Sequence, residues 1–203
     1  LVVSVPPKAH LALLVLLLLS PGRTIPATTL IDRLWSETSL PVDPMNALQI
    51  RVSKLRRSLA GLGGDLVTRE RVGYRINVDP SAIDAEQFVE KLRQARGRAN
   101  AAGGAYTDDD LGAYDDALAL WAGEPLSDFR TEQWATTEAA RLNELRLAAL
   151  TERTQIALAL GRHLEALGDL VGAHHEVRHV VAEPDHDPAP GLVAQEGVER
   201  NHA

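Results

Sequence analysis

The chain has 203 residues, of which 45% are hydrophobic and 24% charged, as is ordinary for a globular protein with a packed core. It contains no cysteine, which excludes disulfides and cysteine-ligated zinc sites. The net charge of −7 is spread unevenly: residues 1–80 carry ten Lys and Arg against six Asp and Glu, whereas residues 81–203 carry 11 against 22. This asymmetry favours a basic half that binds nucleic acid, joined to an acidic half with another task.

The first predicted helix begins at Pro7 and continues to Ser20, where Pro21 ends it. Its nearly all-leucine run, residues 11–19, also resembles the apolar segment of a secretory signal. The run is too short to span a bilayer, however, and its basic flank is a single lysine. We therefore expect a buried helix in a cytoplasmic protein.

Two further helices are predicted before any strand. The first covers residues 30–35 and takes its N-cap from Thr28 or Thr29. A loop rich in polar residues and proline follows, and the second helix covers residues 44–59 before a glycine-rich stretch.

A β-hairpin is predicted next, with strands over residues 66–69 and 74–78 around a turn that contains Gly73. Apolar residues alternate along the second strand, as is typical of a half-buried strand, and we expect Tyr74 in the core. Three helices followed by a hairpin is the order of a winged helix-turn-helix.

From Asp84 onward the pattern is wholly helical. Helices are expected over residues 84–99, 108–121 and 131–160, and another begins near His163. The helix-turn-helix spacing predicts a tetratricopeptide-like α-helical domain, so the fold class is mainly α. Residues 173–203 are rich in proline and aspartate, which favours an irregular or disordered tail.

The helix over residues 44–59 has two faces of different chemistry. The apolar face, expected to anchor the helix, consists of Met45, Leu48, Val52, Leu55 and Leu59. The remaining surface carries side chains that suit a major groove: Asn and Gln pair with adenine, Arg and Lys with guanine, and an apolar group can contact the thymine methyl. The candidate DNA-contacting residues on this helix are Asn46, Gln49, Ile50, Arg51, Ser53, Lys54, Arg56 and Arg57.

A solvated basic helix face is the competing interpretation of the same residues. The expected exposure of Ile50 and the absence of any Asp or Glu between residues 44 and 64 weigh against it. The hairpin, residues 66–78, adds Arg69, Arg71 and Arg75, which could enter the minor groove or contact the backbone. Trp35, at the end of the preceding helix, is expected in the core.

One motif belongs to a different class of function. His175, Glu176 and His179 match the H-E-x-x-H pattern, in which two histidines bind zinc and the glutamate acts as a general base. The pattern lacks the longer three-histidine form and lies in a polar tail, so we favour coincidence over a zinc-dependent hydrolase. A helical protein-interaction module without DNA binding is the other alternative.

These motifs resemble a known family. Residues 30–35, 46–59 and 66–79 are similar to the OmpR-type winged helix, a phosphorelay-type effector domain, of the Streptomyces antibiotic regulatory proteins. Residues 84–88, 117–126 and 144–153 look like the bacterial transcriptional activation domain that follows it there. The resemblance covers about residues 7–170 and implies a DNA-binding domain over 1–80 and a shortened activation domain over 81–172.

The resemblance implies a non-enzymatic regulator that binds direct repeats in double-stranded DNA near promoters, as a homodimer on DNA, and helps to recruit RNA polymerase. The sequence contains no nucleotide-binding loop and no Ser/His/Asp arrangement, so we expect no cofactor, and we expect no membrane partner. The resemblance places DNA contacts on the residues named above other than Ile50. Two departures matter. The family has a small β-sheet before its first helix, and only residues 1–5 could form part of it here. The second domain is shorter than in the family, so we expect apolar surface to be exposed on its last helices.

Overall fold

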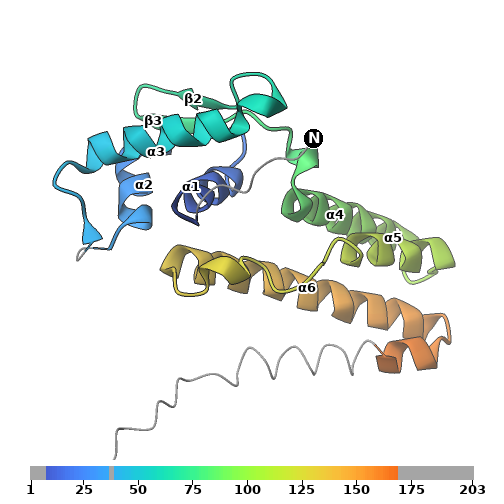
Figure 1. Cartoon of the computed structure of the whole chain (residues 1–203). Coiled ribbons are helices and arrows are strands. Elements are labelled where there is room, and N and C mark those ends of the chain that lie inside the picture. The colour runs from blue at the N-terminus through green and yellow to red at the C-terminus, as the bar shows by residue number, and fades with distance from the viewer. Residues whose placement is uncertain (1–7, 37–38, 169–203) are drawn as a thin grey trace, which may run out of the picture.

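The computed structural model describes residues 8–36 and 39–168 (Figure 1). Their helices and strands form two units, each with its own hydrophobic core. Within these residues no helix is both long and apolar enough to cross a membrane, and no three acidic or histidine side chains form a group that could hold a metal ion. The H-E-x-x-H motif, the expected irregular tail and residues 1–5 lie outside the described residues.

The first unit is a winged helix, as predicted. Its elements are α1 (Lys8–Leu18), β1 (Ile25–Pro26), α2 (Ala27–Leu34), α3 (Pro44–Leu59), a 3₁₀ turn (Ala60–Leu62), β2 (Val67–Arg69) and β3 (Gly73–Ile76). The leucines of α1 supply the centre of its core: Leu13, Leu16 and Leu17 are fully buried and pack in one cluster with residues of α2, α3 and the sheet. The prediction of a buried helix is confirmed.

The sheet has one strand more than the predicted hairpin. Its order is β1-β3-β2 with all pairs antiparallel, and Ile25 and Pro26 of β1 lie opposite Tyr74 and Gly73 of β3. A two-residue strand that contains proline carries no strand signal, although proline is tolerated at a sheet edge. Pro26 is also the N-cap of α2, so the N-cap predicted at Thr28 or Thr29 is wrong.

Helix α3 begins and ends where the sequence predicts. The Asp43 side chain accepts a hydrogen bond from the Asn46 backbone N–H at 3.0 Å, and Pro44 occupies the first turn, where its missing N–H costs nothing. The residues that anchor it in the core are Leu48, Val52, Leu55 and Leu59. Met45 was expected beside them but is 41% exposed, because the first turn of α3 lies beyond the core, which α3 enters at Leu48.

The second unit is helical. It contains two short 3₁₀ turns (Pro80–Ala82 and Ser127–Phe129), helices α4 (Asp84–Ala102), α5 (Asp108–Leu118) and α6 (Gln133–Ala159), and helical residues 163–168. Helices α4, α5 and α6 pack side by side around Phe88, Leu92, Leu111, Tyr114 and Ile156 (Figure 1). Apolar side chains stay exposed at its last turns, among them Leu158, Leu164 and Leu167.

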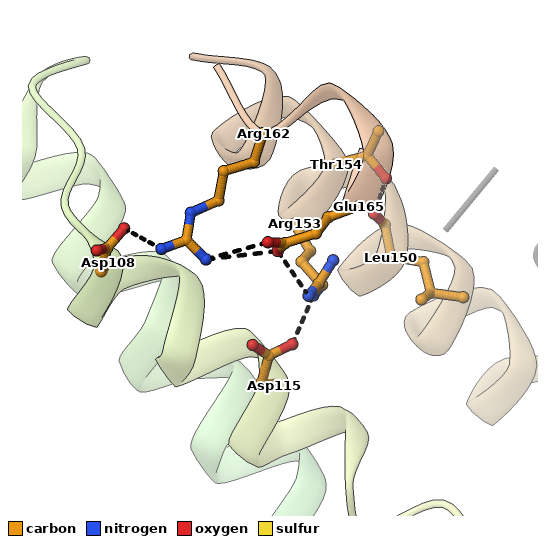
Figure 2. Close-up of polar contacts among 7 residues, drawn as sticks. All are labelled: Asp108, Asp115, Leu150, Arg153, Thr154, Arg162 and Glu165. Carbon is orange, nitrogen blue, oxygen red and sulfur yellow. Dashed lines mark hydrogen bonds and ion pairs between the residues drawn. The ribbon is translucent and has the colours of Figure 1, made fainter. Parts of the chain in front are cut away.

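A network of ion pairs connects the last described helical turns to the rest of this unit (Figure 2). Arg153 of α6 pairs with Asp115 of α5 at 2.5 Å and lies 3.8 Å from Glu165. Arg162 pairs with Asp108 at 2.7 Å and with the same Glu165 at 3.2 Å. Two arginines thereby share one glutamate, which holds the turns after α6 against α5.

The two units touch through α1 and the start of α6. Trp134 packs against the core of the first unit and against the ring of Phe129, with 5.3 Å between ring centroids. The Lys8 ammonium lies 5.9 Å from the centroid of the Phe129 ring. Helix α1 therefore lies between α3 and the beginning of α6, and the outer face of α3 is left uncovered (Figure 1).

Candidate nucleic-acid interface

The outer face of α3 is polar, basic and solvent-exposed. Ile50 is apolar but 48% exposed, and the face has no acidic residue. The side chains of Gln49, Lys54 and Arg57 make no hydrogen bond or ion pair within the described residues. The exposed members of the predicted set on this helix are Asn46, Gln49, Ile50, Ser53, Lys54, Arg56 and Arg57.

Arg51, also predicted to contact DNA, packs against its own domain. Its guanidinium carbon lies 4.0 Å from the centroid of the Trp35 ring, and burial lowers the pKa of Arg51 from its ordinary value. Trp35 in turn packs against the core, as predicted. The pair is a cation–π contact that fixes the end of α2 against α3.

Arg56 is exposed but holds α3 to the wing, which is the hairpin of β2 and β3. Its Nε donates a hydrogen bond of 2.7 Å to the carbonyl oxygen of Val67 in β2, and the same atom lies 3.9 Å from the Asp65 carboxylate. A charged donor to a backbone carbonyl is among the stronger hydrogen bonds in proteins. Arg56 therefore positions the wing relative to α3.

Replacing Arg56 with alanine should separate this positioning role from DNA contact. We expect the free energy of unfolding to fall by about 1 kcal/mol, because a half-exposed charged hydrogen bond is lost. Arg57→Ala, one residue away and without a partner, should leave stability within about 0.5 kcal/mol of wild type. Urea denaturation of the two variants measures the difference, and equal midpoints would contradict the role of Arg56.

The three arginines of the wing also divide into exposed side chains and one that binds within its own domain. Arg69 at the end of β2 and Arg71 in the turn that follows are both exposed, and a 2.9 Å hydrogen bond from the Glu70 N–H to the Gly73 carbonyl closes this turn. Arg75 is half-buried and pairs with Glu70 at 3.3 Å. Tyr74 is 4% exposed and belongs to the core, as predicted. Arg75 supports the wing, and the other two arginines point their charge to solvent.

His10 is a neighbour of this face that the sequence did not reveal. Burial lowers the pKa of His10, and the nearby charges of Lys54 and Arg51 lower it further, so the imidazole is neutral at neutral pH. His10 belongs to α1 and meets α3 only through tertiary packing, so no spacing in the sequence identifies it.

Two families match the two units. The family described as "Transcriptional regulatory protein, C terminal" matches residues 5–76, which covers the winged helix. The family described as "Bacterial transcriptional activator domain" matches residues 83–187, more than half of the chain. The order of the two matches is the order of the two units in the structure.

Similar proteins carry regulatory names. The regulatory protein DnrI of Streptomyces peucetius is 33% identical over 165 residues, which cover 76% of this chain and 58% of DnrI. The regulatory protein AfsR of Streptomyces coelicolor is 36% identical over 175 residues, which cover 85% of this chain and 17% of AfsR. The chain thus spans little more than half of one relative and under a fifth of the other.

A solved structure agrees with the fold of both units. Mycobacterium tuberculosis EmbR, in complex with a low-affinity phosphopeptide, superposes with a TM-score of 0.76 at 27% identity, over 85% of this chain and 46% of EmbR. The mainly α fold, a winged helix followed by a helical domain, is thereby confirmed. The chain belongs to the Streptomyces antibiotic regulatory protein family, whose members join an OmpR-type winged helix to a bacterial transcriptional activator domain.

Proposed function

We propose that this chain is a sequence-specific DNA-binding transcriptional activator that reads the major groove with α3. The observation that supports the proposal is the outer face of α3, where amide, basic and one apolar side chain are exposed together and no carboxylate interrupts them. Such a mixture can distinguish base pairs by their edges, whereas a plain solvated face has no need of an exposed isoleucine.

The residues divide into three roles. Base reading belongs to the exposed side chains of α3: Asn46, Gln49, Ile50, Ser53, Lys54 and Arg57. Arg69 and Arg71 of the wing contact the minor groove or the phosphates beside it. The third group, Arg51, Arg56 and Arg75, holds α2, the wing and α3 in the geometry that the other two groups need.

The division into domains supports a regulator with two tasks. We assign DNA binding to residues 1–80 and activation to residues 81–172; the two family matches cover residues 5–76 and 83–187. Relatives are named as regulatory proteins, so we infer a regulatory and non-enzymatic role in the cytoplasm, on chromosomal DNA. Direct repeats as the operator, a homodimer on DNA and recruitment of RNA polymerase complete the proposal.

The salt dependence of DNA binding tests this function directly. Neutralising phosphates releases counterions, so about four phosphate contacts should weaken binding roughly 150-fold between about 50 and about 200 mM salt. The variant Arg69→Ala/Arg71→Ala should lower the slope of log Kd against log salt by about two. Fluorescence anisotropy of a labelled duplex measures both. A folded protein that binds no duplex at low salt would instead favour the protein-interaction module.

A further inference from the structure

Helix α1 is apolar on every side, which one hydrophobic core does not explain. Residues 11–19 are all apolar, and none of them is exposed. Leu13, Leu16 and Leu17 are fully buried in the core of the first unit, and they account for one side of the helix. A helix that is apolar all round is one that neighbours cover all round. The other side of α1 therefore requires a second apolar partner.

The second unit supplies this partner. Helix α1 lies between α3 and the beginning of α6 (Figure 1). Apolar residues of both units line the hollow between them, among them Val15, Leu18 and Leu19 on one side and Leu126 and Leu142 on the other. Leu142 is 5% exposed but belongs to neither hydrophobic core, so the junction of the two units is what buries it.

Phe129 and Trp134 make the contact between the units. Phe129 is 2% exposed and lies outside both cores, and its ring contacts the Lys8 ammonium of α1 as well as the ring of Trp134. Trp134 is in the first turn of α6, yet it packs against the core of the first unit. Aromatic side chains dominate the energetics of interfaces, so Trp134 is the side chain on which this contact depends most.

The rest of the junction offers little to fix an orientation. Residues 77–83 connect β3 to α4, and the Asp79 carboxylate stiffens this connection by accepting a hydrogen bond of 2.9 Å from the Ser81 N–H. A single short connection limits the separation of the units but not their rotation about it. The ion pairs described above each lie within one unit. Domains move relative to each other unless an apolar contact holds them.

We propose that Trp134 is a positioning residue, which holds the winged helix and the helical unit in one orientation, so that α3 meets DNA with the second unit at a fixed place beside it. The orientation itself does not depend on the proposed function. Its consequence for DNA rests on that function: copies bound to direct repeats would stand at a spacing that the rigid pair of units sets.

Distances between spin labels test the orientation in the full chain without DNA. The chain has no cysteine, so labels can be attached at Asp32→Cys on α2 and Asn100→Cys on α4, both exposed positions. Pulsed dipolar spectroscopy should give one narrow distance distribution. Trp134→Ala should widen it about two-fold or more, because the units then move independently. Trp134→Phe, which keeps a ring, and Gln133→Ala, at the exposed neighbouring position, should leave it narrow.

A second pair of labels separates positioning from folding. With Asp32→Cys and Ser58→Cys both labels lie in the first unit, so Trp134→Ala should leave their distance distribution unchanged. A widened distribution for this pair would mean that Trp134 only completes the core of the first unit. That result would overturn the proposal, as would a distribution between the units that is equally narrow in Trp134→Ala or equally broad in the wild type.

DNA binding adds a readout that a purely structural role would not change in the same way. On a duplex with one site, Trp134→Ala should bind within about two-fold of wild type, because α3 is intact. On direct repeats, the wild type should favour one spacing about ten-fold over others, and Trp134→Ala should lose this preference. The same preference in the variant would contradict positioning by Trp134. A wild type that binds no duplex would contradict the proposed function alone, since the label distances decide the role of Trp134 without DNA.

Discussion

Replacing Arg57 or Lys54 with alanine should weaken binding to the cognate duplex by about 1–3 kcal/mol, or roughly five- to 150-fold in Kd. Both side chains are exposed on α3 and have no ion pair within the described residues, so their hydrogen-bonding groups are free for base edges. Anisotropy titrations with a duplex that the protein itself has selected from a random pool would measure the change.

Arg98→Ala is the matched control for these two variants. Arg98 is exposed on α4 of the second unit, so its removal alters the net charge equally but leaves α3 intact. We expect its affinity to stay within about two-fold of wild type. If Arg98→Ala weakened binding as much as Arg57→Ala, net charge rather than groove reading would explain the affinity.

Gly73→Ala should have the largest effect on stability. A Cβ atom at this position would collide with the carbonyl oxygen of Ile25 and lie 2.8 Å from Cα of Pro26, both of them backbone atoms of β1. Strand β1 must move away from β3, which we expect to lower the free energy of unfolding by about 2–3 kcal/mol. Thermal and urea denaturation of the purified variant measure this loss.

Gly61→Ala provides the comparison for that substitution. Nothing lies within 4 Å of a Cβ atom at Gly61, and its φ is not positive, so alanine fits. The variant should be neutral or slightly more stable, because alanine restricts the unfolded chain. Equal stability of Gly73→Ala and Gly61→Ala would mean that β1 does not pair with β3 as described.

The sequence predicts the helices well because their signals are local. Helix α3 begins at Pro44 and ends at Leu59 as expected, since a proline opens its first turn, a glycine-rich stretch follows it and apolar residues recur at helical spacing. The strand β1 is missed because its two residues acquire strand geometry only by pairing with β3. Local patterns cannot identify an element that tertiary contact alone creates.

The candidate interface shows the same limit. The periodicity of α3 separates the buried face from the outer face, and only Met45 is assigned to the wrong one. It cannot show that Arg51 packs on Trp35 or that Arg56 binds Val67, because those partners lie on α2 and β2. The tertiary structure is therefore required to distinguish basic residues that are free to contact DNA from basic residues that hold the domain together.

Selection from a pool of random duplexes, followed by sequencing, tests the central claim most directly. The wild-type chain should enrich a short motif that occurs as a direct repeat, and the double variant Lys54→Ala/Arg57→Ala, folded to the same extent, should not enrich it. Absence of enrichment by the folded wild-type protein, or the same motif from the double variant, would contradict groove reading by α3.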